Sequence, residues 1–243
     1  MVVSEEPTCY QEAVTEGRWY EAMKNELKSI EKNKTWSLIE LPLGYKPIGL
    51  KWVFKLKKDP NGEVVKHKAR LVAKGYVQRQ GIDFEEVFAP VARLDTVRVI
   101  LALAANQSWE VHHLDVKSAF LNGELEEEVY VTQPEGFEVP NEKHKVYRLS
   151  NALYGLRQAP QAWNIRLDRS LKDLGFRKCT QEQTVYTRRE EEECVLVGVY
   201  VDDLIVTGSS TEKVKKFKQQ MMAEFETSDL GLLSYYLGIE VEQ

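Results

Sequence analysis

Apolar residues recur at helical spacing in four stretches of the chain. In the first stretch, Trp19, Met23, Leu27 and Ile30 fall on one face of a helix. The other three are LDTVRVILALAANQ, the segment that runs from a break at Pro160 through Trp163, Leu167 and Leu171 to a stop at Gly175, and TEKVKKFKQQMMAEF. The second stretch is apolar at nearly every helical position, so we expect a buried helix with Asp95 or Thr96 as its N-cap.

Extended segments separate these helices. KTWSLIELP reads as a strand, and KWVFKLKK and EVVKHKARLVAKGY read as the two arms of a hairpin. The turn residues between those arms are Asp59, Pro60, Asn61 and Gly62. Further strands are expected at VHHLDV, KVYRL, TVYTRR, CVLVGVYVDDLIVTG and LSYYLGIEVE. Because helices and strands alternate irregularly, the pattern predicts an α+β fold with an antiparallel sheet rather than regular βαβ units.

Composition places the chain among globular proteins. Its 243 residues, 43% hydrophobic and 29% charged, suffice to bury a sizeable core in one or two domains. No window approaches the roughly 18 uninterrupted apolar residues of a membrane span, and MVVSEEPTCYQEAV lacks the features of a secretion signal. The three cysteines form no zinc pattern with the four histidines, so we expect reduced thiols in a cytosolic or nuclear protein.

The net charge of -5 hides a strong segregation along the chain. Residues 46–79 contain ten basic and two acidic side chains, a net charge of +8. On the second arm of the hairpin, Lys66, Lys68 and Arg70 share one face because side chains alternate along a strand. Residues 110–142 carry nine acids against Lys117. A surface that binds phosphate would therefore be confined to the basic part of the chain. Taken alone, the basic run and the acidic run are each also typical of a solvated face.

Two adjacent aspartates interrupt the apolar run VLVGVYVDDLIVTG. A carboxylate taken out of water without compensation costs several kcal/mol, and Asp202 and Asp203 also repel each other. They match the two positions of a tight hairpin turn between the arms Val195 to Val201 and Leu204 to Thr207. They equally suit a metal site at the end of a sheet core, and the pair alone does not decide between these interpretations.

A metal site for phosphoryl transfer needs a further carboxylate on a neighbouring strand. Asp115 qualifies, since it is the lone acid in the apolar strand VHHLDV and has Lys117 as its nearest base. Alone, such a residue is more typical of a cap or a salt bridge.

Three ordered segments, VHHLDVKSAFLNGELEEEVYVTQPEGF, LYGLRQAPQAW and YVDDLIVTG, closely resemble the reverse transcriptase of copia-type LTR retrotransposons. The basic segment KWVFKLKKDPNGEVVKHKARLVAKGY and the terminal LSYYLGIEV are similar to the same family. The resemblance implies a polymerase right hand with fingers and palm subdomains and an antiparallel palm sheet packed on helices. It implies an N-terminal helix and first fingers part at 1–88, palm at 89–121, fingers at 122–157 and palm at 158–243. We expect most of the thumb, and any ribonuclease H domain, to be absent.

The resemblance also implies roles for individual residues. The catalytic residues would be Asp115, Asp202 and Asp203, which with the Val116 carbonyl would hold two Mg²⁺ ions, replaceable by Mn²⁺. Residues implied at the nucleotide are Lys55, Lys68, Arg70, Phe120, Gly155, Arg157 and Gln158, with Lys57 or Lys66 as substitutes for the lysines. Residues implied at the primer or template are Tyr200, Tyr236, Leu237 and Gly238. Phe120 would exclude a ribose 2'-hydroxyl, whereas the sequence alone favours a core phenylalanine.

The implied activity is an RNA- and DNA-directed DNA polymerase that joins a dNTP to a primer 3'-hydroxyl. Its partners would be an RNA or DNA template with its primer, without a membrane, and its location the cytoplasm, within the virus-like particle of the parent element, or the nucleus. Two alternatives stay open: a domesticated, non-catalytic nucleic-acid-binding or scaffold protein, and a carboxylate-metal hydrolase acting on another phosphate.

Overall fold

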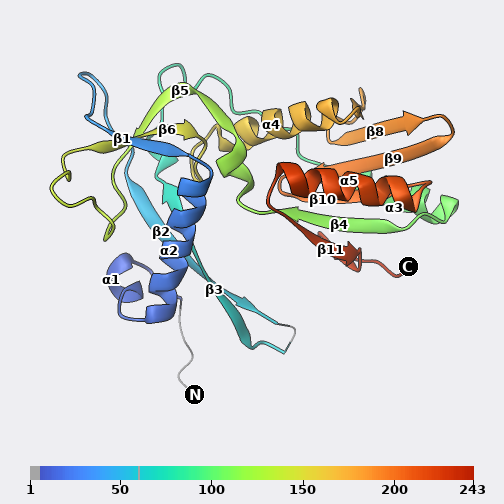
Figure 1. Cartoon of the computed structure of the whole chain (residues 1–243), viewed down its shortest axis with the longest axis horizontal. Helices are drawn as coiled ribbons and strands as arrows, with labels where there is room; N and C mark the ends of the chain where they lie inside the picture. The colour runs from blue at the N-terminus through green and yellow to red at the C-terminus, as the bar shows by residue number, and fades with distance from the viewer. Residues whose placement is uncertain (1–5, 60) are drawn as a thin grey trace. The chain divides into compact units, whose positions relative to one another are not determined.

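The fold is known from a computed structural model that describes residues 6–59 and 61–243. It divides into two units, the first built from residues up to 88 and 120–163, the second from residues 89–119 and 164–243. The chain therefore passes three times from one unit to the other. Each unit combines helices with antiparallel strand pairs, as the irregular alternation of helices and strands predicts (Figure 1).

The first unit contains a basic hairpin, a small sheet and two helices. Its elements are α1 (Tyr10–Ala13), α2 (Gly17–Lys32), β1 (Trp36–Ile39), β2 (Leu50–Lys58), β3 (Val64–Ala73), the 3-10 turn Gly75–Val77, β5 (Glu124–Val131) and β6 (Val146–Asn151). Strands β1, β6 and β5 form one sheet in that order, and β2 pairs with β3. The 3-10 turn Ala119–Asn122 and helix α4 (Ala159–Asp173) each cross the division between the units.

Alternation along the hairpin determines which of its faces is buried. Trp52 and Phe54 of β2 lie in the core with Ala69 and Leu71 of β3, against Trp19 of α2. The intervening side chains form the opposite, basic face. At the tip, the Gly62 N–H donates to the Asp59 carbonyl at 3.0 Å. Pro60, expected in this turn, lies outside the described residues.

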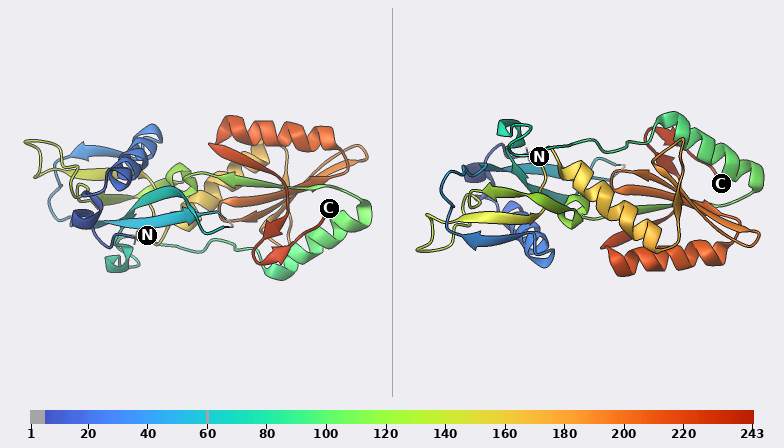
Figure 2. Two further views of the ribbon diagram at one scale, coloured as in Figure 1. Left: turned by 90° about the horizontal axis from the view of Figure 1, so that it is seen from below. Right: turned by 90° about the horizontal axis from the view of Figure 1, so that it is seen from above.

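The second unit is built on a six-stranded sheet in the order β11-β4-β10-β9-β8-β7, with every neighbouring pair antiparallel. Its remaining elements are α3 (Leu94–Gln107), β4 (Val111–Val116), β7 (Arg177–Lys178), β8 (Val185–Glu190), β9 (Glu193–Tyr200), β10 (Asp203–Gly208), α5 (Thr211–Glu224), β11 (Thr227–Leu232), β12 (Tyr235–Tyr236) and β13 (Ile239–Glu240). Helix α3 covers one face of this sheet and α5 the other (Figure 2).

Helix α3 packs closely on the sheet because β9 has a glycine beneath it. Gly198 lies beneath the helix, and a Cβ there would come within 2.7 Å of Cδ1 of Ile100. The helix buries Val97, Ile100 and Ala104 but leaves Val99 67% exposed. The expected all-round burial of this helix is therefore wrong, because only one of its faces reaches the sheet.

Several local expectations need correction. Helix α3 begins at Leu94, so its N-cap is Arg93 and not Asp95 or Thr96, which lie in the first turn. Strands β5 and β11 were not expected, and the final segment is a two-stranded hairpin, β12 and β13, instead of one strand.

Candidate active site

Two of the predicted catalytic aspartates lie directly opposite each other on neighbouring strands. Asp115 of β4 pairs with Asp203 of β10 in the antiparallel ladder. Directly opposite residues project from the same face of a sheet with Cβ atoms roughly 4.5–5.5 Å apart. On the other side of β4, Ser228 of β11 is opposite Asp115. The sheet register thus brings together two carboxylates that lie far apart in the sequence.

The third aspartate occupies the turn between β9 and β10. Because Asp203 pairs with Tyr200, the two turn residues are Val201 and Asp202, not Asp202 and Asp203 as the sequence suggested. The expected turn was one residue out of place because pairing with β4 also fixes the register of β10. The Val116 N–H donates to the Asp202 carbonyl at 2.9 Å and so ties the turn to β4. The ligand role of the Val116 carbonyl stays a prediction.

Val201 adopts a left-handed backbone conformation, with a φ of 56°. A β-branched residue at positive φ is a genuine outlier, and such conformations cost on the order of 1–3 kcal/mol. They persist where the surrounding structure over-determines them, and they cluster at functional sites. Here the ladder between β10 and β4 and the hydrogen bond to Val116 hold the turn in place.

His113, which no motif in the sequence indicated, contacts the carboxylate of Asp203. Its Nε2 lies 2.8 Å from Oδ1 of Asp203, and the imidazole stands edge-on to the ring of Tyr236 at 5.4 Å between centroids. Side-chain alternation supplies the missed signal, since residues two apart on a strand share a face and His113 precedes Asp115 by two positions.

The residues predicted at the primer lie around the same carboxylate. Tyr236 is buried, and its hydroxyl donates to the Asp203 carbonyl at 3.5 Å. Burial raises the pKa of the Tyr236 hydroxyl, and the negative charge of Asp203 raises it further. Tyr200 is opposite Asp203 in the ladder. Leu237 and Gly238, with φ of 48° and 85°, form the turn between β12 and β13.

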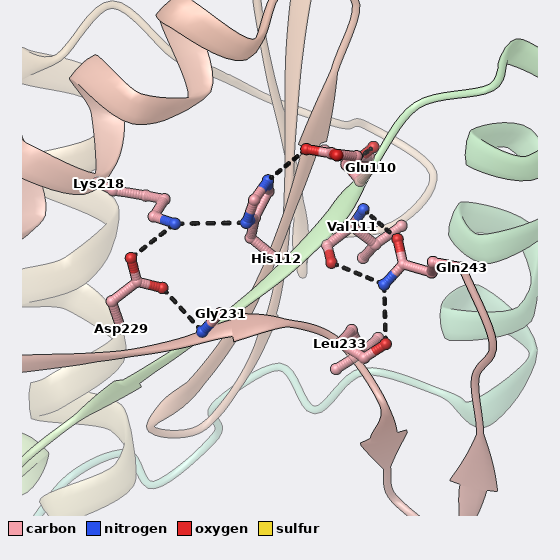
Figure 3. Close-up of polar contacts among 9 residues, drawn as sticks. Glu110, Val111, His112, Lys218, Asp229, Gly231, Leu233 and Gln243 are labelled. Carbon is pink, nitrogen blue, oxygen red and sulfur yellow. Dashed lines mark hydrogen bonds and ion pairs between the residues drawn. The ribbon is translucent and has the colours of Figure 1, made fainter.

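On the opposite face of β4, His112 belongs to a separate polar network (Figure 3). Lys218 of α5 lies 3.3 Å from Nδ1 of His112 and 2.6 Å from a carboxylate oxygen of Asp229 on β11. Burial lowers the pKa of His112, and the neighbouring Lys218 charge lowers it further. This network connects α5 and β11 to the strand that carries Asp115. The two adjacent histidines therefore have different surroundings.

In the first unit, the predicted phosphate-binding lysines form cross-strand pairs. Lys55 is opposite Lys68, and Lys57 is opposite Lys66, all on the face of the hairpin that points away from the core. Like charges directly opposite each other destabilise a sheet. Lys55 is ion-paired with Glu6, which also accepts from the Leu56 N–H at 2.9 Å. The pairing concentrates positive charge on one surface, as the alternation predicted.

The LYGLRQAP segment is fastened to the end of β3. The Ala73 N–H donates to the Tyr154 carbonyl at 2.7 Å. Gly155 has a φ of 91°, and a Cβ there would approach the Ala73 carbonyl oxygen to 2.2 Å. Gly75 faces the same contact, since its Cβ would lie 2.1 Å from the Gly155 carbonyl oxygen. The close approach that makes glycine necessary at 155 is thus to the chain itself.

The remaining predicted nucleotide residues differ in exposure. Arg157 is exposed, and its Nε donates to the Gly75 carbonyl at 3.2 Å. Gln158 is buried, and its amide bonds the side chain of Gln78 at 3.0 Å and the Asp83 carbonyl at 3.2 Å. Phe120 is half-buried against the core of the unit. Contact of any of them with a nucleotide stays a prediction.

The donor atoms at the Asp115 and Asp203 pair are of the type that hard divalent cations prefer. Over residues 6–59 and 61–243, no three His, Cys, Asp or Glu side chains already converge as a metal cluster. Asp115 and Asp203 fit a divalent ion by their chemistry and by the sheet face that they share. Within the same described residues, no helix is both long and apolar enough to cross a membrane.

Comparisons with known proteins agree on one family. The sequence profile of "Reverse transcriptase (RNA-dependent DNA polymerase)" matches residues 33–243. The chain is 45% identical over 221 residues to the retrovirus-related Pol polyprotein from transposon TNT 1-94 of Nicotiana tabacum. The aligned region covers 90% of this chain and 17% of the relative. It is 36% identical over its full length to the Pol polyprotein from transposon RE1 of Arabidopsis thaliana, again 17% of the relative.

A more distant relative is the Gag-Pol polyprotein of transposon Ty1-DR4 of Saccharomyces cerevisiae, 24% identical over 96% of this chain and 15% of the relative. The chain thus spans about 17% of the length of its more similar relatives. The profile match covers most of the sequence, including every aspartate of the candidate site. This protein belongs to the reverse transcriptase family of the copia-type retrotransposon Pol polyproteins.

Proposed function

We propose that this chain is an RNA- and DNA-directed DNA polymerase, in which the 3'-hydroxyl of a primer attacks the α-phosphate of a dNTP and releases pyrophosphate. The observation that carries the proposal is the placement of Asp115 directly opposite Asp203, with Asp202 in the adjoining turn. A sheet rarely sets two carboxylates side by side without compensation, because like charges in opposite positions destabilise the pairing.

In this proposal, Asp115, Asp202 and Asp203 hold two Mg²⁺ ions with help from the Val116 carbonyl, and Mn²⁺ can replace them. When bound, the ions would supply positive charge at the attacking oxygen and at the leaving group. The chain's own contribution is to fix the carboxylates. The ladder between β4 and β10 places Asp115 and Asp203, and the bond from the Val116 N–H places the Asp202 backbone.

The basic face of the hairpin supports binding of the nucleotide triphosphate. Lys55, Lys68 and Arg70 project from one face, where charge-assisted donors would meet phosphate oxygens. Lysines stand opposite each other across this hairpin, and like charges in opposite positions are destabilising, so an anionic ligand at this face would be favourable. Glu6, now paired with Lys55, would be displaced if this lysine binds phosphate.

We assign residues 1–88 and 122–157, which include the basic hairpin, to the fingers of a polymerase right hand, and residues 89–121 and 158–243, which include the aspartates, to its palm. Tyr200, Tyr236, Leu237 and Gly238 then serve the primer, and Phe120 contacts the sugar of the incoming nucleotide. The burial of Tyr236 beside Asp203 supports a role for the β12–β13 hairpin close to the site.

Primer extension tests the proposal directly. The chain is incubated with oligo(dT) on poly(rA), and separately on poly(dA), with dTTP and Mg²⁺. We expect incorporation on both templates and its loss in Asp202→Asn. Unchanged incorporation by this variant would refute the assignment of Asp202. Binding of the primer duplex without extension would instead favour a non-catalytic nucleic-acid-binding protein.

A further inference from the structure

Three side chains of the first unit form a row in which each contacts the next. The guanidinium carbon of Arg70 lies 5.1 Å from the centroid of the Tyr154 ring. The Tyr154 ring in turn lies 5.1 Å from the ring of Phe120, centroid to centroid, with the planes inclined by 52°. Tyr154 is the middle member of this set, which we call the Arg70–Tyr154–Phe120 column. It connects a residue assigned to the triphosphate with a residue assigned to the sugar.

The aromatic ring is a principal contact of Arg70. In the part of the chain that the structure describes, no carboxylate forms an ion pair with this arginine, and its buried Nε has no hydrogen-bond partner. A guanidinium stacked on an aromatic face is attracted by the ring quadrupole and retains the N–H groups along its edge for an anion. The Tyr154 ring therefore restricts the orientation of Arg70 without neutralising its charge.

Tyr154 is itself held by the backbone around it. Its carbonyl accepts the Ala73 N–H at 2.7 Å, and the next residue, Gly155, packs on β3 so tightly that a Cβ would overlap the chain. Leu153 and Leu156 are buried on either side in the sequence. The backbone that carries the ring is therefore held in place by its own contacts. Replacing the Tyr154 side chain would alter the positions of Arg70 and Phe120 more than the backbone fold.

We propose that Tyr154 is a positioning residue that sets both the triphosphate contact of Arg70 and the sugar contact of Phe120. This inference rests on the proposed polymerase function and deepens it. One ring then supports two properties: affinity for the triphosphate, through Arg70, and rejection of a ribose, through Phe120. A tyrosine that merely fills the core would influence stability and neither of these properties.

The test compares Tyr154→Leu and Tyr154→Phe with the unchanged chain, and uses Tyr147→Leu as a matched control. Tyr147 stacks on Trp36 at 4.1 Å in the same unit and has no part in the column. In steady-state extension of oligo(dT) on poly(rA), we expect Tyr154→Leu to raise the KM for dTTP about fivefold to tenfold, with kcat changed less than about threefold. The preference for dTTP over UTP should fall several-fold. Tyr154→Phe, which keeps the ring, should restore both values.

Two further measurements separate positioning from packing. Tyr154→Leu and Tyr147→Leu should lower the melting temperature similarly, while only the former changes KM and sugar preference. The double variant Arg70→Ala/Tyr154→Leu should have the same KM as Arg70→Ala alone, because the ring acts through the arginine. An additive rise in KM, or an unchanged KM and sugar preference in Tyr154→Leu, would overturn the proposal.

Calorimetry measures the binding of dTTP with Mg²⁺ independently of primer extension. It therefore tests the role of Tyr154 separately from the proposed polymerase activity. If the unchanged chain extends primers but Tyr154→Leu binds dTTP as tightly, the column has no positioning role and the polymerase assignment survives. If the unchanged chain binds dTTP without extending primers, the polymerase assignment fails. Weaker binding by Tyr154→Leu would then still support the column, and equal binding would refute it.

Discussion

Asp203 of β10 and Asp115 of β4 are direct partners in an antiparallel ladder, and His113 of β4 contacts the Asp203 carboxylate from the diagonal position. The ladder is flanked by β9 on one side and β11 on the other. A one-residue slip in this register would turn either aspartate to the opposite face of the sheet. The arrangement of the site therefore depends on strand pairing and does not rest on a mobile loop.

Phe120→Ala should relax the choice of sugar. If the ring blocks a ribose 2'-hydroxyl, removing it should raise UTP incorporation relative to dTTP by at least about tenfold, a change of about 1.4 kcal/mol. Competitive extension on poly(rA)/oligo(dT) measures the ratio. Phe137→Ala is the control, because Phe137 stacks on Tyr20 in the same unit and has no proposed role at the nucleotide. An unaltered ratio in Phe120→Ala would show that the phenylalanine only packs.

Gly155→Ala should be far more damaging than Gly44→Ala. Both glycines have nearly the same φ, 91° and 89°, so the left-handed strain of about 1–2 kcal/mol is common to both changes. At Gly155 the new Cβ would lie 2.2 Å from a backbone oxygen, whereas at Gly44 it would meet no atom of the described residues within 4 Å. Urea unfolding should show a difference of at least about 2 kcal/mol. Equal losses would contradict the close approach to β3.

Glu26 should make the stability of the first unit depend on pH. This carboxyl is buried on α2 and accepts the Leu71 N–H at 3.3 Å. Burial raises its pKa from an ordinary 4.5 to about 7. The folded state thus keeps its proton at pH values where the unfolded chain has lost it, so the free energy of unfolding falls as pH rises from about 4.5 to about 7 and then levels off.

Glu26→Gln should remove this dependence and stabilise the protein at pH 8, by at most about 3 kcal/mol. Denaturant titrations at pH 5, 6, 7 and 8 would measure it. Glu21→Gln on the exposed side of the same helix is the matched control. A parallel pH profile for Glu26→Gln and the unchanged chain would contradict the raised pKa.

Lys218→Met should destabilise the second unit by about 1 kcal/mol, because it leaves the Asp229 carboxylate, whose side chain is 31% exposed, without its cation. Lys215→Met, at an exposed position of the same helix, should change stability by less than about 0.5 kcal/mol. Adding Asp229→Asn to Lys218→Met should recover part of the loss. Chemical denaturation measures all three, and equal stability of the two lysine variants would contradict the network of Figure 3.

The sequence predicted those parts of the fold in which periodicity was unambiguous. Alternation along β2 and β3 identified the basic face correctly, and the spacing of Trp19 and Met23 identified α2. Strand β5 was not expected because ELEEEVYV is rich in glutamate, which is depleted in strands, although Val129 to Val131 are buried. Strand β11, TSDLGL, has weak strand propensity, and its pairing with β4 overrides that weakness.

Motifs in the sequence name the aspartates of the candidate site but do not indicate how they are arranged. Asp115, Asp202 and Asp203 were named from motifs, whereas the pairing of Asp115 with Asp203, and the turn at Val201, follow from a ladder between distant segments. The Arg70–Tyr154–Phe120 column was not predicted from the sequence for the same reason. Arg70 and Tyr154 are far apart in the chain and meet only when the hairpin packs on the LYGL segment. Local patterns report which residues share a face, and long-range pairing decides which faces meet.

Primer extension by Asp115→Asn determines whether the paired aspartates are catalytic. Asparagine keeps the shape of the side chain and removes its charge, and Asp95→Asn provides the same change at an exposed position of the same unit. With dTTP and Mg²⁺ on poly(rA)/oligo(dT), we predict that Asp115→Asn loses at least about 1,000-fold in kcat, equivalent to about 4 kcal/mol in the barrier, while its melting temperature stays close to that of Asp95→Asn. Extension by Asp115→Asn at the rate of Asp95→Asn would show that Asp115 has no part in catalysis.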